Sequence, residues 1–256
     1  MKRDPYKHKE KYQNWKIAVG EGIPDISKTN SNIIIRFLED MEVGRNVSSR
    51  SSKGPRSYIR LNTLRQKLVF FSKRFKVEFG LEDITKISED EIISFFAKIR
   101  TGEVAREDGS VYASIDTYGK VFKSFWHWWI KVNRKEGITI SDITIDLDVR
   151  TNKPSWVYLT EDQVRSVCDN SIFKYRVLIM FLFDTGIRAP TELMNIKVSD
   201  FLNDFKELNI RDEVSKTFGR RIKLMICSEI IKEYVSKNHL SLNDHLFKKH
   251  PSIVKT

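Results

Sequence analysis

An arginine and a lysine, each in a short polar turn, are the residues of this chain best suited to chemistry on an anion. Arg188 lies in Asp-Thr-Gly-Ile-Arg-Ala-Pro-Thr-Glu over 184–192, and Lys216 lies in Ser-Lys-Thr over 215–217. A planar guanidinium donates two parallel hydrogen bonds to phosphate oxygens, and a lysine ammonium can protonate a departing oxygen. We therefore take both as candidate catalytic residues acting on a phosphate group.

Structural roles are the alternative for both residues. Arg188 is close enough in sequence to Asp184 and to Glu192 for an ion pair, and Lys216 suits a solvated turn.

The elements that must position these two residues follow from the surrounding pattern. Thr-Glu-Asp-Gln over 160–163 is a capping box that opens a helix. The run over 177–183 is apolar on all sides, which predicts a central buried helix ending at Gly186. Pro190 suits the first turn of a short helix over 191–197.

A β-hairpin is predicted to carry the lysine. Strands are expected over 208–211 and 221–226, joined by a tip over 216–220. Ser228 then caps a helix through Tyr234, where we expect this tyrosine to be packed.

The N-terminal half is predicted to be helical. Apolar residues at three- or four-residue steps, with a capping box at Ser88 and Glu91, predict helices at about 31–43, 61–75, 89–100 and 114–135. The last of these has a broad aromatic face. Aromatic faces can stack on single-stranded bases, but the helical spacing favours core packing.

A long basic segment separates the first of these helices from the third. Ten Lys and Arg residues and no Asp or Glu occur between positions 45 and 76. Ordinary surfaces mix both charges, so we interpret this segment as a site of phosphate contact. The candidate DNA-binding residues are Arg45, Arg50, Lys53, Arg56, Arg60, Arg65, Lys67, Lys73, Arg74 and Lys76.

Composition supports a polyanionic partner and argues against other classes. The 256 residues carry 45 Lys and Arg against 34 Asp and Glu, a formal net charge of +11. No apolar stretch is long enough for a membrane span, and the N-terminus lacks a signal-peptide core, so we expect a cytoplasmic protein. Cys168 and Cys227 are expected to be buried thiols, and we predict neither metal nor cofactor.

The predicted organisation is mainly α with a small β-hairpin or sheet. We expect a flexible basic arm over 1–27, a helical DNA-binding domain over 28–140, a linker over 141–157 and a second domain over 158–256.

In this order of motifs the chain resembles the tyrosine recombinases, also called lambda-type or phage integrases. The resemblance is strongest over 157–226, where a helix opened by Leu-Thr-Glu is followed by Thr-Gly-x-Arg and Ser-Lys-Thr. It implies a helical core-binding (SAM-like) domain, then part of an α+β catalytic domain. It also implies a protein that works on double-stranded DNA, as a homo-oligomer, from a prokaryotic, archaeal or viral source.

The resemblance gives the candidate residues their roles. Arg188 would stabilise the transition-state phosphate, Lys216 would protonate the departing 5′ oxygen, and Glu192 would orient or pair with Arg188. The spacing from Arg188 to Glu192 is one residue longer than the usual pattern. The order and spacing of the motifs favour these roles over purely structural ones.

The remaining catalytic residues of the family are absent from this sequence. No His-x-x-Arg segment and no later tyrosine follow the helix of Tyr234. We therefore expect a DNA integration and recombination protein truncated before its nucleophile, with a separate C-terminal fragment as a candidate partner. The alternative is a non-catalytic DNA-binding regulator or inhibitor derived from an integrase. A metal-dependent transposase is less favoured, since no suitable carboxylate cluster occurs.

Overall fold

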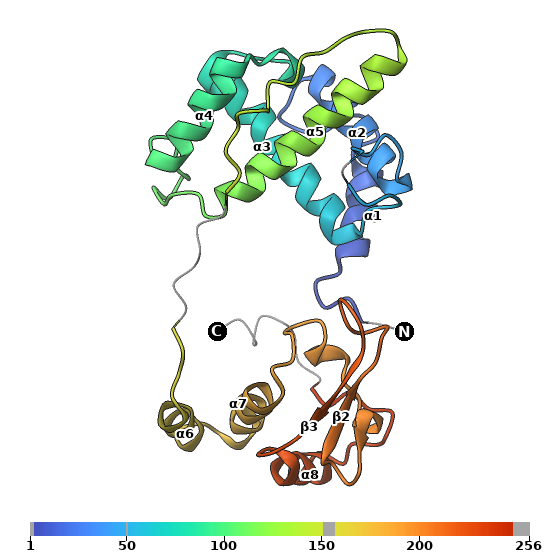
Figure 1. Cartoon of the computed structure of the whole chain (residues 1–256), viewed down its shortest axis with the longest axis vertical. Helices are drawn as coiled ribbons and strands as arrows, with labels where there is room; N and C mark the ends of the chain where they lie inside the picture. The colour runs from blue at the N-terminus through green and yellow to red at the C-terminus, as the bar shows by residue number, and fades with distance from the viewer. Residues whose placement is uncertain (1–2, 50, 151–156, 248–256) are drawn as a thin grey trace. The chain divides into compact units, whose positions relative to one another are not determined.

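The computed structural model describes residues 3–49, 51–150 and 157–247, and it divides into two compact units (Figure 1). The helical unit spans His8–Pro154, and the second unit combines Ser155–Thr256 with the short segment Met1–Lys7. The fold is mainly helical with a small antiparallel sheet, which confirms the predicted fold class.

The helical unit is built from α1 (His8–Ala18), α2 (Lys28–Val43), α3 (Tyr58–Phe79), α4 (Glu89–Thr101) and α5 (Ile115–Lys135). Side chains of Ser27, Ser57 and Ser88 accept hydrogen bonds from backbone N–H groups in the first turns of α2, α3 and α4. Glu91 completes the capping box predicted for α4. Gly44 ends α2 in the left-handed conformation, which glycine adopts readily.

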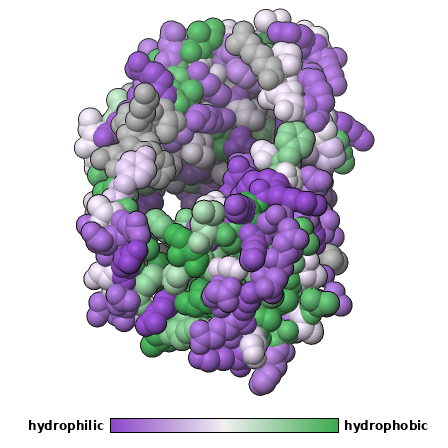
Figure 2. Space-filling model, turned by 60° about the horizontal axis from the view of Figure 1, so that its bottom comes forward, coloured by the Kyte–Doolittle hydropathy of each residue, from purple (hydrophilic) through white to green (hydrophobic). Residues whose placement is uncertain are grey.

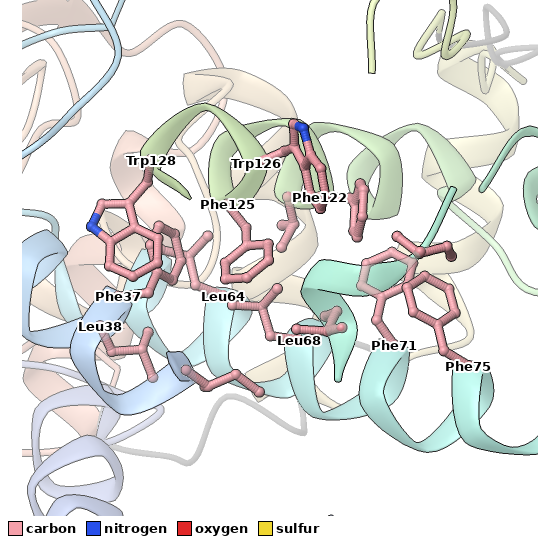
Figure 3. Close-up of a cluster of buried hydrophobic side chains, with 14 of the residues drawn as sticks. Phe37, Leu38, Leu64, Leu68, Phe71, Phe75, Phe122, Phe125, Trp126 and Trp128 are labelled. Carbon is pink, nitrogen blue, oxygen red and sulfur yellow. The ribbon is translucent and has the colours of Figure 1, made fainter. Parts of the chain in front are cut away.

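Aromatic packing between α5 and the helices beneath it forms the core of this unit (Figure 3). The rings of Phe71 and Phe122 have centroids 5.2 Å apart, as do those of Phe37 and Trp128. Each ring buried in this way contributes about 1.5–3 kcal/mol because its apolar surface is removed from water. The aromatic face of α5 therefore packs in the core, which confirms that prediction over base stacking.

The N-terminal segment differs from the flexible arm predicted for 1–27. Residues 8–18 form α1, which packs on α3 with Tyr12 only 1% exposed. The side-chain amide of Asn62 donates to the carbonyl of His8 at 2.8 Å. Most residues of α1 are charged or polar, but Tyr12 and Trp15 pack against the hydrophobic core and hold the helix in place.

The predicted linker over 141–157 is also partly ordered against the helical unit. Leu147 is buried, and the indole of Trp126 donates to the carbonyl of Ser141 at 2.9 Å. His127 pairs with Asp142 at 3.0 Å. The Ile and Leu residues that alternate with the aspartates provide this docking, whereas residues 151–156 lie outside the described part of the chain.

The second unit contains α6 (Glu161–Asp169), α7 (Phe173–Thr185), two 3-10 turns (Leu193–Asn195 and Val198–Asp200), strands β1 (Phe201–Leu202), β2 (Glu207–Ile210) and β3 (Arg220–Lys223), and α8 (Ser228–Lys237). The strands pair antiparallel in the order β1-β2-β3, with Leu208 opposite Ile222. The capping box of Thr160 and Gln163 opens α6 as predicted.

Three local predictions for this unit are corrected. Helix α7 is not buried on all sides, because Phe183 is 48% exposed. Figure 2 shows hydrophobic residues among hydrophilic ones on the face that it presents. The predicted helix over 191–197 is a single 3-10 turn. Strand β3 ends at Lys223 because the backbone N–H groups of 225–227 turn away to donate to Asp184.

Candidate functional site

The turn after α7 places Arg188 against a buried carboxylate. Helix α7 ends at Gly186, whose φ of 56° lies in the left-handed region that glycine adopts readily. The Nη1 of Arg188 lies 3.1 Å from Oε1 of Glu192, and its backbone N–H donates to Oε2, also at 3.1 Å. Glu192 is only 1% exposed. The structural alternative for Arg188 is therefore observed, with Glu192 rather than Asp184 as its partner.

The β-hairpin contributes two further contacts to the same carboxylate. Arg220 on β3 donates from Nη1 to Oε1 at 3.3 Å and from Nη2 to Oε2 at 2.9 Å. The hydroxyl of Ser215 donates to Oε1 at 3.4 Å. Glu192 thus joins the Arg188 turn to the middle of the hairpin loop at Ser215 and to the start of β3 at Arg220, a role that the sequence pattern did not reveal for Arg220.

These contacts keep Glu192 ionised. Burial alone would raise its pKa, but hydrogen bonds from Arg220 and from the Arg188 backbone outweigh burial and lower the pKa to about 2. A charged carboxylate at this position holds both guanidinium groups in place, because protonation would remove its negative charge and turn one oxygen into a hydroxyl donor.

Lys216 lies next to Ser215 in an exposed bend of the β2–β3 loop. This loop spans 211–219 and is longer than the predicted tip over 216–220. Asp212 accepts a 2.7 Å hydrogen bond from the backbone of Gly219. A Cβ at Gly219 would lie 2.6 Å from the carbonyl oxygen of Ile210, so the loop needs glycine there.

Tyr234 is packed inside the second unit, as predicted. It is 7% exposed, and its ring lies against those of Phe173 and Phe247. Burial raises the pKa of its hydroxyl. A nucleophile must be accessible and activated, so this tyrosine is not placed for attack on a phosphate.

Three of the predicted DNA-binding residues instead pack within the helical unit. Arg65 covers the ring of Trp15 at 5.1 Å, and Lys67 lies 3.1 Å from the ring centroid of Tyr118. Burial lowers the pKa of Lys67 to about 8. Arg74 donates to a backbone carbonyl at 2.8 Å. These aliphatic stems and flat guanidinium groups fill space beside aromatic rings, a use that charge counting does not detect.

Two more predicted contacts are in surface ion pairs. Lys73 lies 2.9 Å from Asp25, and Lys76 lies 2.7 Å from Glu82. The segment over 45–76 contains no acidic residue, but acidic residues from other parts of the chain, Asp25 and Glu82, lie beside it in the fold. Such exposed pairs contribute at most about 1 kcal/mol, so a phosphate can compete for either lysine.

The other basic residues of the segment lie in the loop between α2 and α3 and in the first turn of α3. Arg45 and Lys53 are exposed, Arg56 and Arg60 are half-buried, and Arg50 lies outside the described residues. Burial, with the neighbouring charge of Arg56, lowers the pKa of Arg60.

The polar face of α5 adds basic residues to this loop. Lys131 donates to the carbonyl of Val47 at 2.9 Å, and Lys135 donates to Asn46 at 2.6 Å. Together with the loop they border a hollow of about 870 Å³, which we call the α5 groove. Its lining includes Ser48, Ser49, Lys123, His127, Lys131, Arg134, Lys135 and Asp142.

The sequence contains a signal for this groove. Lys123, His127, Lys131 and Lys135 recur at four-residue steps, so they share one face of a helix whose other face is aromatic. We find no group of three or more His, Cys, Asp or Glu residues arranged for a metal ion within 3–49, 51–150 and 157–247. Over the same residues, no helix has the length and apolar character that a membrane crossing requires.

Comparison with known proteins finds matches among solved structures. No protein-family model and no curated protein matches the chain. Among solved structures, the chain is similar to the crystal structure of XerA recombinase, with 19% sequence identity and a TM-score of 0.32, over 86% of this chain and 69% of that chain.

Proposed function

We propose that this chain binds double-stranded DNA as a protein of the site-specific recombinase or integrase type. The α5 groove is the observation that carries the proposal. Lys123, Lys131, Arg134 and Lys135 border it, and Lys53 approaches it by donating to the carbonyl of Ser48 at 3.2 Å.

The charge balance around the groove favours a polyanion. Asp142 is the acidic residue in its lining, and it pairs with His127 at 3.0 Å. A hollow bordered by cations and nearly free of acids concentrates positive potential, which attracts a phosphate backbone independently of base sequence.

In the second unit, we propose that Arg188 contacts a backbone phosphate. Its side chain is 50% exposed, so the guanidinium can donate outward while Nη1 remains on Glu192. Lys216, exposed in the neighbouring loop, would protonate a departing 5′ oxygen as general acid. Strand cleavage additionally requires a nucleophile, which the packed Tyr234 does not provide.

The burial of Tyr234 also supports a second candidate function, a DNA-binding regulator or inhibitor without catalysis. Both candidates share DNA binding and differ in whether a histidine, an arginine and a tyrosine from outside residues 1–256 act together with Arg188 and Lys216.

Charge reversal in the α5 groove tests the proposal. We would measure binding of a fluorescein-labelled duplex by anisotropy for the wild type and for the variant Lys53→Glu/Arg134→Glu. The matched control is Lys28→Glu/Lys86→Glu, which reverses two exposed lysines of the same unit. These lie at the end of α2 opposite the α2–α3 loop, because Ile84 donates to Asn30 at 2.7 Å.

We expect the groove variant to bind more weakly, with a salt slope reduced by about one unit for each phosphate that the protein no longer neutralises. The control variant should bind nearly as well as the wild type. Equal losses in both variants would mean that binding depends on total charge and not on the groove.

A further inference from the structure

Two guanidinium groups converge on the single buried carboxylate of Glu192. Oε1 of Glu192 lies 3.1 Å from Nη1 of Arg188 and 3.3 Å from Nη1 of Arg220. Both arginines are therefore within hydrogen-bond distance of one oxygen, although they are separated by two 3-10 turns and two strands in the chain.

One carboxylate cannot neutralise two guanidinium groups. With Glu192 ionised, the cluster carries one excess positive charge, and the exposed Lys216 follows Ser215 in the same loop. Like charges held this close repel one another, so the arrangement is most stable with a further anion.

Both arginines keep hydrogen-bond donors for such an anion. A guanidinium has five N–H donors, and each bond to Glu192 uses one of them. The side chain of Arg188 is 50% exposed and that of Arg220 is 34% exposed, so both reach solvent from a fixed position. Their rigidity lowers the entropy lost on binding a tetrahedral oxyanion.

We propose that Arg220 is a second phosphate-binding residue, which shares one DNA backbone phosphate with Arg188, and that Glu192 positions both. The inference rests on the proposed function for the identity of the anion as a phosphodiester. The motifs that carry the resemblance assign no role to Arg220.

The neighbouring residue on β3 provides a matched control. Arg220 is half-buried against Glu192, whereas Arg221 is exposed and pairs with Asn209 in the strand register. Because successive side chains of a strand point to opposite faces, Arg221 has the same chemistry but does not face Glu192.

The first experiment follows the arginine Nε–Hε signals of the intact chain by NMR. Inorganic phosphate is added at constant ionic strength, with chloride as the reference anion, and signals are assigned with single Arg→Lys variants. We expect the Arg188 and Arg220 signals to shift with one common dissociation constant, while Arg221 stays unchanged. A shift of Arg188 alone, or equal shifts with chloride, would overturn the inference.

The second experiment measures duplex DNA affinity for Arg188→Lys, Arg220→Lys, the double variant and Arg221→Lys. Lysine keeps the charge but loses the planar pair of donors. We expect Arg188→Lys and Arg220→Lys each to weaken binding about tenfold with an unchanged salt slope. The fold-loss of affinity in the double variant should be smaller than the product of the two single losses. An Arg220→Lys affinity equal to that of Arg221→Lys would contradict the proposal.

The two experiments separate this inference from the proposed function. Phosphate shifts at both arginines without duplex binding would reject DNA as the partner and support the two-arginine site. Duplex binding that depends on Arg188 but not on Arg220 would leave the function standing and reject the shared phosphate. The phosphate titration is performed on the unaltered protein, and the Arg→Lys variants are needed only to assign the Arg188, Arg220 and Arg221 signals.

Discussion

Arg220 donates to both carboxylate oxygens of Glu192, at 3.3 and 2.9 Å, and thereby fastens β3 to the turn that contains Glu192. The same carboxylate accepts from Arg188 and Ser215. The geometry of the candidate site therefore depends on one buried charge.

Glu192 should make the stability of the second unit depend on pH. Its pKa falls from 4.5 to about 2 on folding, so its contribution is fully present above pH 4.5 and is lost as the pH falls toward 2. The shift corresponds to on the order of 3 kcal/mol. Amide hydrogen-exchange protection factors in β2 and β3, which correct for the intrinsic pH dependence of exchange, should therefore fall on acidification, and Glu192→Gln should flatten this response.

Glu213→Gln provides the comparison, because Glu213 is exposed and pairs with Arg211 at the surface. This variant should retain the acid response of the wild type. Unchanged exchange in Glu192→Gln would show that the carboxylate does not hold the hairpin.

Lys67 should be dispensable for DNA binding. It lies over the ring of Tyr118, and burial lowers its pKa to about 8, so its charged form is destabilised by folding at neutral pH. Lys67→Met keeps the apolar stem and removes the charge. We expect an equal or higher melting temperature and unchanged duplex affinity. A loss of affinity as large as that of Arg134→Glu would show that Lys67 does contribute to DNA binding.

Limited proteolysis should separate the two units beyond the docked part of the predicted linker. Residues 141–148 contact the helical unit through Trp126, His127 and Arg100. With a broad-specificity protease and mass spectrometry, we expect a stable helical fragment that ends after Asp148. A fragment that ends before Ser141 would contradict the observed docking.

Local signals in the sequence were sufficient to predict most of the helices. Ser88 with Glu91 and Thr160 with Gln163 predicted helix starts, because a capping box is complete within four residues. The aromatic spacing of α5 predicted its buried face for a similar reason.

Contacts between residues distant in the chain were not predicted. The pairing of Lys73 with Asp25 and the docking of Tyr12 on α3 involve partners that no local window contains. The convergence of Arg188 and Arg220 on Glu192 likewise follows from the pairing of the hairpin with the α7 turn.

The chain alone should bind a nicked suicide substrate without forming a covalent adduct on a denaturing gel, because Arg188 and Lys216 cannot replace a nucleophile. An adduct that disappears in Tyr234→Phe would refute this. If a C-terminal fragment bearing the histidine, arginine and tyrosine restores the adduct, Arg188→Ala and Lys216→Ala should each abolish or greatly slow it. Unchanged activity in both variants would reject the assigned roles.

The salt dependence of duplex binding tests the central claim most directly. Phosphate contacts release counterions, so the logarithm of the association constant should fall linearly with the logarithm of salt concentration, by about 0.9 per phosphate neutralised. Anisotropy titrations of the wild-type chain across low to moderate salt measure this slope. We predict a steep negative slope that becomes shallower in Lys53→Glu/Arg134→Glu. Equal affinity at low and moderate salt would contradict binding through the α5 groove.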